Sequence, residues 1–338
     1  MKSSRILAKQ PHPRSLGNEA EHLRSSAQRG MSLIEVLVVI GILGLLIALI
    51  VPAVQASREA SRRITCVNNL HQIGVGMQTY HSNFDVFPSD LFGWHVQLLP
   101  YLDQKNLYGL TEGGSFLYLS PVKLAELAKH SVPNYICPSD YRVTSGSGLI
   151  FNYRMCAGDG VHENGVSVKG PAGVDGGDSL SPVGARDIVD GLSQTVAIAE
   201  RLTVDPQPID SLPATHPELG LQIIRRAGTA YFTPDQLDAF AKECDATPLP
   251  ATEWIGEPCN ELTCFDYNHV LPPNHWSCCS NTGGTQVFQA RTATSQHRGG
   301  VNILLADGSV RFVSQSVDPK VWRSLGTRNG REPIAGNY

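Results

Sequence analysis

The hydrophobic pattern is dominated by an uncharged run of nineteen residues, VLVVIGILGLLIALIVPAV, at positions 36–54. As a helix with a rise of ~1.5 Å per residue, this run would be roughly 28 Å long, which is enough to cross the hydrocarbon core of a bilayer. A helix buried in a soluble core carries a polar stripe, whereas this run has none on any face. The pattern therefore predicts a membrane-spanning helix over residues 31–56.

After this run the apolar residues recur at steps of three and four, which predicts an amphipathic continuation of the same helix over residues 57–90. The recurring residues are Ile64, Val67, Leu70, Ile73, Met77 and Tyr80. One helix from about Ser32 to His81 would be roughly 75 Å long. Because its second half needs a surface to pack against, we expect its apolar stripe to lie on a globular head formed by residues 91–338.

Within the head, alternating apolar residues predict a C-terminal β-hairpin over residues 300–314, with Asp307-Gly308 at the turn. Residues 193–202 predict a buried strand. Two Ser-Pro or Thr-Pro pairs, Ser120-Pro121 and Thr233-Pro234, are typical of helix starts. The 32 Gly and 22 Pro favour a β-rich or mixed body over a helix bundle. The expected fold class is α+β, with a long N-terminal transmembrane and amphipathic helix packed on a β-rich globular head.

Charge is unevenly distributed along the chain. Residues 1–30 hold six basic and two acidic residues, a net charge of +4. Because the whole chain has a net charge of −4, residues 31–338 carry a net charge of −8. Basic residues before a membrane helix favour the cytoplasmic side, which places residues 1–30 inside the cell and the head outside. No Lys/Arg-dense face of the kind that neutralises phosphates occurs in the head, so nucleic acid is not an expected partner.

The junction before the apolar run carries a second signal. A cleaved secretory signal would have small residues after the run, whereas here Arg29-Gly30 precedes it directly, followed by MSLIE. Glu35 stands at the edge of the membrane segment, where a carboxylate requires a partner such as the ammonium group of a neighbouring subunit. A glutamate that snorkels to the interface is the structural alternative.

The stretch from Arg29-Gly30 through MSLIEVLVVIGILGLLIALIVPAV resembles the class III signal of type IV pilins and type II secretion pseudopilins. The resemblance implies cleavage after Gly30 by a prepilin peptidase, removal of residues 1–30 and N-methylation of Met31, which replaces the commoner Phe. It also implies that Glu35 pairs with the N-terminus of an adjacent subunit and that Pro52 bends the helix. The expected fold is then pilin-like.

A second resemblance covers both ends of the chain and several internal segments. These segments are similar to a large bacterial family of prepilin-signal proteins with a domain of unknown function, whose C-terminal signature of His, nine residues and Asp-Gly is matched by His297, Asp307 and Gly308. Membership would inform architecture more than activity. His297 and Asp307 could be acid/base or metal partners, but the turn already explains an Asp before Gly.

Eight cysteines form an even set in a head expected outside the cytoplasm, where disulfides are favoured. They are Cys66, Cys137, Cys156, Cys244, Cys259, Cys264, Cys278 and Cys279. About 105 complete pairings are possible. Because Cys66 and Cys137 lie in two segments that resemble the family, a bridge between them is the favoured pairing. It would tie the long helix to the head.

Metal sites are the alternatives to these bridges and to plain surface loops. Five cysteines crowd into residues 244–279 together with His269 and His275, which makes zinc the alternative to disulfides there. Acidic loops between residues 157 and 178 could bind calcium, although they lack the spacing of a dedicated calcium loop. We therefore expect no cofactor, with zinc and calcium as the alternatives.

The chain has no nucleophile elbow, His-Glu-x-x-His pair, phosphate loop or dinucleotide fingerprint, so we do not expect an enzyme. We expect a pseudopilin-like structural subunit, anchored by a single pass in the bacterial inner membrane with a cytoplasmic N-terminus. Its expected partners are the prepilin peptidase and other pseudopilin subunits in a type II secretion or type IV pilus-like filament. The alternative is a membrane-tethered binding or enzymatic protein that uses the prepilin signal for sorting. A formed pocket in the Cys-rich insertion around residues 203–290 would favour this alternative.

Overall fold

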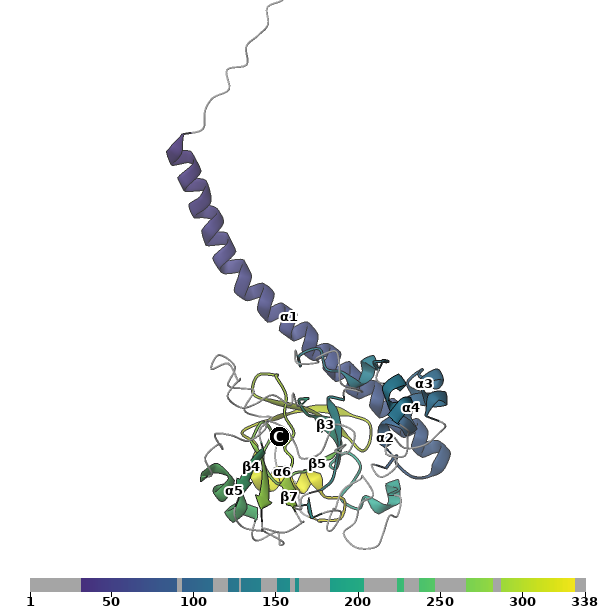
Figure 1. The fold of residues 1–338 in the computed structure, drawn as a ribbon. Helices are drawn as coiled ribbons and strands as arrows, with labels where there is room; N and C mark the ends of the chain where they lie inside the picture. The colour runs from purple at the N-terminus through teal and green to yellow at the C-terminus, as the bar shows by residue number, and fades with distance from the viewer. Residues whose placement is uncertain are drawn as a thin grey trace, which may run out of the picture. The chain divides into compact units, whose positions relative to one another are not determined.

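The computed structural model describes most of the chain, with gaps. The described residues are 32–89, 93–111, 121–127, 129–140, 151–158, 162–163, 183–203, 224–227, 237–246, 266–281 and 287–331. The chain divides into two compact units, Met1–Val54 and Gln55–Tyr338. One helix, α1 (Leu33–Phe84), begins in the first unit and ends in the second (Figure 1).

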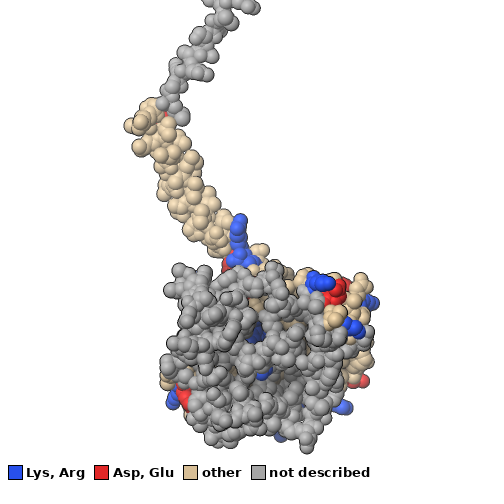
Figure 2. Space-filling view, in the orientation of Figure 1, with Lys and Arg blue, Asp and Glu red and all other residues tan. Residues whose placement is uncertain are grey.

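The N-terminal part of α1 is apolar and exposed. Its large hydrophobic side chains from Leu33 to Val54 all face outward. Figure 2 shows this stretch as a surface without charged residues between its two ends. In the described part of the chain, α1 is the helix that is long and apolar enough to cross a membrane. The helix continues through Pro52, whose ring removes one backbone donor. The predicted apolar helix is confirmed.

The C-terminal part of α1 packs on the head through one stripe. Its buried residues recur at the helical spacing seen in the sequence: Cys66, Leu70, Ile73, Gly74, Gly76 and Met77. The amphipathic interpretation therefore holds. This amphipathic part was expected to extend to residue 90, but the helix ends at Phe84. Asp85, with a φ of 59°, turns the chain out of the helical conformation immediately after that residue.

A five-stranded sheet forms the centre of the head, in the order β5-β1-β3-β8-β9. Its strands are β1 (Tyr153–Cys156), β3 (Val196–Glu200), β5 (Asp266–Tyr267), β8 (Gly300–Leu305) and β9 (Val310–Ser314). All neighbours are antiparallel except β1 and β5. The hairpin β8–β9 has Gly300 opposite Ser314, which confirms the predicted boundaries of 300–314.

Both faces of this sheet are covered, so successive side chains along its strands pack into two different hydrophobic clusters. Ile198 and Leu304 pack in one cluster with the buried stripe of α1. Val301 and Ile303 pack in the other with Trp322 of α6 (Pro319–Gly326). The C-terminal part of α1 is thus one layer of the core of the head.

The Cys-rich insertion builds a second sheet and also enters the first. The four-stranded sheet has the order β2-β7-β6-β4, and β4 pairs in parallel with β6. Its strands are β2 (His162–Glu163), β4 (Ile224–Ala227), β6 (Ser277–Asn281) and β7 (Val287–Ala290), with α5 (Leu237–Ala246) beside them. Because β5 joins the central sheet, this described part of the insertion is built into the head.

Short helices complete the described head. They are α2 (Trp94–Leu98), η2 (Leu99–Tyr101), α3 (Lys105–Leu110), α4 (Pro121–Leu127), η4 (Pro133–Tyr135) and η5 (Ala185–Asp187). Helix α4 begins at Pro121 as predicted, whereas the predicted start at Thr233-Pro234 lies outside the described residues. Most of the acidic loops considered for calcium, 159–161 and 164–178, also lie outside them.

Candidate functional site

The processing signal is only partly described, because Gly30 and Met31 lie outside the described residues. The next residues form a helix cap. The Ser32 backbone N–H donates to Glu35 Oε2 at 2.8 Å, and the Val36 N–H donates to the Ser32 carbonyl at 3.2 Å. This is one half of a capping box, whose signal in the sequence is Ser-x-x-Glu. This local role of Glu35 was not among the predictions from the sequence.

The Asp-Gly end of the C-terminal signature makes a tight turn. Asp307 Oδ1 accepts hydrogen bonds from the Ser309 N–H at 2.9 Å and from the Ser309 hydroxyl at 2.7 Å. Gly308 has a φ of +90°, which favours glycine. The predicted turn is confirmed, and it accounts for both residues without any catalytic chemistry.

This turn lies directly on α1. A Cβ at Gly74 would come within 2.8 Å of Leu304 Cδ1 and 3.1 Å of the Gly308 carbonyl oxygen. One helical turn later, the Gln78 amide donates to the Ala306 carbonyl at 2.6 Å. The close approach of helix and hairpin therefore depends on a helix position without a side chain.

The His end of the signature contacts two glutamates. His297 Nε2 lies 3.2 Å from Glu200 Oε1 in β3, and Nδ1 lies 3.2 Å from Glu59 Oε1 in α1. The His297 side chain is fully buried. Of the two interpretations of Asp307, the structure supports the turn, and the side chain of His297 contacts the two glutamates.

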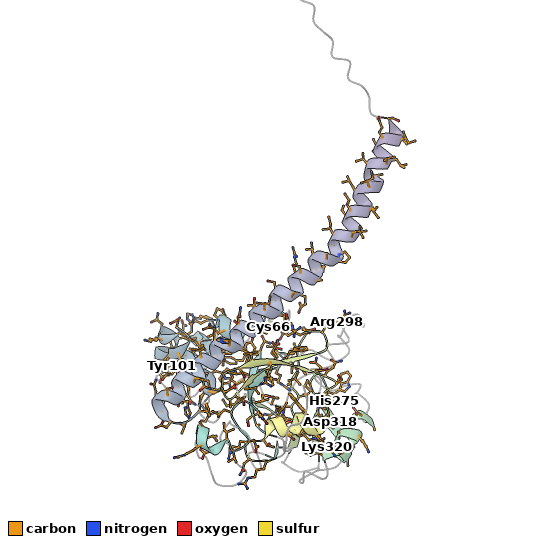
Figure 3. The ribbon with its side chains drawn as sticks, turned by 180° about the vertical axis from the view of Figure 1, so that it is seen from behind. Cys66, Tyr101, His275, Arg298, Asp318 and Lys320 are labelled. Atoms are coloured by element: carbon orange, nitrogen blue, oxygen red, sulfur yellow. A yellow bond between two sulfur atoms is a disulfide. The ribbon has the colours of Figure 1, made fainter. Side chains whose placement is uncertain are left out.

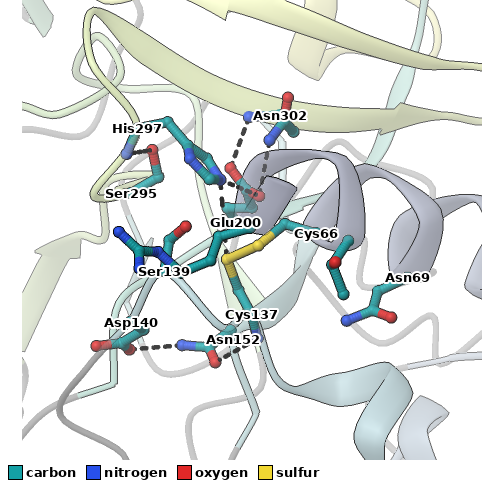
Figure 4. Close-up of polar contacts among 12 residues, drawn as sticks. Cys66, Asn69, Cys137, Ser139, Asp140, Asn152, Glu200, Ser295, His297 and Asn302 are labelled. Atoms are coloured by element: carbon teal, nitrogen blue, oxygen red, sulfur yellow. Dashed lines mark hydrogen bonds and ion pairs between the residues drawn. A yellow bond between two sulfur atoms is a disulfide. The ribbon is translucent and has the colours of Figure 1, made fainter. Parts of the chain in front are cut away.

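A disulfide borders this group. Cys66 of α1 (Figure 3) is bonded to Cys137, 71 residues further along the chain, and this is the pairing favoured from the sequence. Cys137 Sγ lies 3.8 Å from His297 Nε2. The disulfide, Glu200 and His297 therefore lie together and are all buried (Figure 4). We call Cys66, Cys137, Glu200 and His297, together with the partly exposed Glu59 at their edge, the buried cluster.

Hydrogen bonds from neighbouring residues orient both carboxylates. Asn302 donates to Glu200 from its backbone N–H at 2.8 Å and from its amide at 2.9 Å. Glu59 accepts from the Ser139 hydroxyl at 3.0 Å and from Arg62 Nε at 2.8 Å. A buried charge such as that of Glu200 requires such partners, and the partly exposed Glu59 has them as well.

The protonation states of the cluster follow from these contacts. Burial acts to lower the pKa of His297, but the hydrogen bonds and negative charges of Glu200 and Glu59 outweigh it and raise the pKa above its ordinary value. Burial acts to raise the pKa of Glu59, but hydrogen bonds from Arg62, Ser139 and His297 lower it. The two neighbouring carboxyl groups therefore favour the imidazolium form of His297.

The Cys-rich region contains a second disulfide. Cys244 of α5 is bonded to Cys278 of β6. His269 instead lies 2.6 Å from the Trp322 carbonyl through Nδ1, and His275 Nε2 lies 3.0 Å from Asp245 Oδ1. The described residues here thus form a bridge, and the two histidines considered for zinc contact other groups.

The remaining cysteines divide into two groups. Cys156 is a buried thiol whose Sγ lies 3.8 Å from the Gly326 carbonyl, so the expectation of a bridge at this position is corrected. Cys259, Cys264 and the side chain of Cys279 lie outside the described part of the chain.

Two family models match this chain. One, described as "Protein of unknown function (DUF1559)", covers residues 55–320. The chain belongs to this DUF1559 family. The other, described as "Prokaryotic N-terminal methylation motif", covers residues 25–51 and thus includes Gly30, Met31 and Glu35. No curated protein and no solved structure matches the chain.

Both resemblances inferred from the sequence are confirmed. The protein is a pilin-like member of the DUF1559 family with a prepilin-type signal for processing by a prepilin peptidase. Its exposed apolar helix and this signal are those of a membrane-anchored protein. The DUF1559 match spans the whole buried cluster, from Glu59 to His297.

Proposed function

We propose that this protein is a pseudopilin-like structural subunit that assembles through its N-terminal helix into a type II secretion or type IV pilus-like filament of the cell envelope. The observation that carries the proposal is the methylation motif at residues 25–51, placed on the exposed apolar part of α1. In this proposal the leader faces the cytoplasm, α1 crosses the inner membrane once, and the head lies outside and has no catalytic role.

The chemistry of Glu35 supports assembly by charge pairing. A carboxylate in a low-dielectric environment gains stability from a nearby ammonium, and cleavage after Gly30 would create one on Met31 of a neighbouring subunit. Glu35 Oε2 already accepts the Ser32 N–H of its own helix. A carboxylate has about four acceptor positions, so one local bond leaves room for the ammonium of a neighbour.

The head supports an extracytoplasmic location. The described residues contain two disulfides, and disulfides persist in oxidising compartments. The insertion around residues 203–290 contributes β5 to the central sheet. An insertion built into the core in this way favours a structural head over the alternative of a membrane-tethered binding or enzymatic protein.

The test separates the charge of Glu35 from its capping role. Glu35→Gln keeps a side-chain oxygen that can accept the Ser32 N–H but removes the charge, whereas Glu35→Ala removes both. Each variant is expressed with a differently tagged wild-type subunit, and co-assembly is measured by recovery of one tag with the other from a filament fraction. Mass spectrometry of the mature N-terminus confirms that every variant is still cleaved and methylated at Met31.

We expect both variants to lose co-assembly while processing continues. Retention of co-assembly by Glu35→Gln alone would assign the residue to helix capping, and retention by both would assign it to the membrane interface. Either result overturns assembly by charge pairing. A Gly30→Leu variant provides the processing control, because a bulky side chain at the cleaved bond should leave the precursor uncut.

A further inference from the structure

The buried cluster holds four groups that commonly bind metals. We propose that Cys66, Cys137, Glu200 and His297 form a Zn²⁺ site in the reduced protein, so that the disulfide and the bound metal are two alternative states of one cluster. This inference goes beyond the filament proposal and does not depend on it.

The first observation is proximity. One potential ligand atom from each of the four residues lies within 4.8 Å of all the others, and all four residues are buried. They come from α1, from the segment after η4, from β3 and from the loop before β8. The fold therefore assembles this ligand set from four separate parts of the chain (Figure 4).

The second observation is geometry. Around a tetrahedral zinc, bond lengths of about 2.0–2.3 Å place a nitrogen and an oxygen ligand about 3.3 Å apart, and a nitrogen and a sulfur about 3.6 Å apart. His297 Nε2 lies 3.2 Å from Glu200 Oε1 and 3.8 Å from Cys137 Sγ. Three of the four ligands are therefore already near their positions. The sulfurs, bonded to each other, must separate to about 3.8 Å.

The third observation is the arrangement of neighbouring residues. A histidine that binds a metal usually donates its other ring N–H to a carboxylate, and Glu59 Oε1 lies 3.2 Å from His297 Nδ1. This contact directs Nε2 into the cluster. The two bonds from Asn302 hold the carboxylate of Glu200 in the same way. A mixed set of sulfur, nitrogen and oxygen ligands suits Zn²⁺.

The reaction needs a reductant, and a dithiol of the thioredoxin class supplies it. The dithiol transfers two electrons and two protons to the Cys66–Cys137 bond, which yields two thiols, and the dithiol leaves as a disulfide. Zn²⁺ then displaces the proton of each thiol and the proton on His297 Nε2, and these three protons pass to the solvent. In both states the same residues tie α1 to the head.

The test uses the full-length protein in detergent. Oxidised protein and protein reduced with a phosphine are each incubated with Zn²⁺ without oxygen and then desalted, and zinc and free thiols are measured. We expect one zinc per reduced chain and none per oxidised chain. Cys244→Ala/Cys278→Ala should keep the zinc, whereas Cys66→Ala/Cys137→Ala should lose it.

Three further measurements test the ligands and the neighbouring Glu59. Co²⁺ in place of Zn²⁺ should give thiolate-to-cobalt charge-transfer absorption in the reduced protein. Glu59→Gln, which changes a partly exposed residue, should weaken zinc binding about 10–100-fold while leaving the ligands in place. His297→Gln should remove zinc binding, with folding checked by tryptophan fluorescence.

Absence of zinc from the reduced wild-type protein would overturn the proposal. Retention of zinc by Cys66→Ala/Cys137→Ala would also overturn it, because the metal would then be bound elsewhere.

Discussion

The contact between α1 and the hairpin turn predicts that Gly→Ala has opposite effects on stability at two positions of α1, Gly74 and Gly76. Gly74→Ala places a methyl group 2.8 Å from Leu304 Cδ1 and 3.1 Å from the Gly308 carbonyl oxygen. The Leu304 side chain can move, but the backbone oxygen belongs to the hairpin turn and cannot. Gly76→Ala meets only ordinary contacts, at 3.5 Å from Tyr101 Cβ and 3.6 Å from Leu102 Cδ2.

The size of each effect follows from two opposing contributions. Replacing glycine by alanine inside a helix stabilises it by about 0.5–1 kcal/mol. Overpacking in a close contact costs about 1–3 kcal/mol. Gly76→Ala should therefore raise the free energy of unfolding of the head by about 0.5–1 kcal/mol. Gly74→Ala should lower it, by as much as about 2 kcal/mol, since both contributions apply.

The assay is denaturant unfolding of the full-length protein in detergent, followed by the fluorescence of the buried Trp94 and Trp322. The two variants should shift the midpoint in opposite directions with unchanged slope. If Gly74→Ala were as stabilising as Gly76→Ala, the turn would not press on the helix. The close approach of α1 and the hairpin turn at Gly74 would then be refuted.

Four further predictions concern the disulfides and the histidines. Non-reducing peptide mapping should find Cys66 linked to Cys137 and Cys244 linked to Cys278, and any other pairing of these four would contradict the structure. Replacing Cys66 and Cys137 by alanine should cost about 4 kcal/mol, because the bridge closes a separation of 71 residues. The pKa of His297 is raised, so the stability that the paired, protonated side chain gives the folded protein should be complete below pH 6.5 and be lost as the pH rises through the raised pKa. The difference in free energy of unfolding between the wild type and His297→Gln should therefore narrow at alkaline pH. A difference that stays constant with pH would contradict the paired imidazolium. Burial lowers the pKa of His269 to about 3, so the stability that its neutral side chain gives the folded protein should be complete above pH 6.5. As the pH falls toward 3, the free energy of unfolding should decrease by as much as about 5 kcal/mol. The stability of His269→Gln should depend less on pH in that range, and an equal dependence would exclude His269 as its source.

Features encoded by local patterns could be predicted from the sequence. Three features each depend on residues that are close together in the sequence: the apolar run, the three- and four-residue steps of α1 and the Asp307-Gly308 turn. Periodicity and turn chemistry are therefore sufficient to predict them. The Ser32–Glu35 cap was equally local, and its Ser-x-x-Glu signal was present in the sequence.

The buried cluster could not be predicted in the same way. Glu59 and His297 are 238 residues apart, and Glu200 and His297 are 97 apart. Only the packing of α1 against the central sheet brings them together. One signal was available, because Glu200 ends the otherwise apolar strand VAIAE, and a carboxylate in a buried strand requires a partner. The identity of that partner depended on the strand order β3-β8, which no local pattern specifies.

The disulfide at Cys66 has a mechanical consequence for a protein held by its N-terminal helix. Along the chain, the contact of Glu59 with His297 comes before Cys66, and the contacts of Gly74 and Gln78 with the hairpin come after it. A pull applied from the N-terminal end would load the ion pair first and then the covalent bond. The contacts beyond Cys66 would be shielded from the load. While the bridge is intact, tension along α1 therefore passes to the head through Cys137, and the helix cannot be drawn out of the core by sliding.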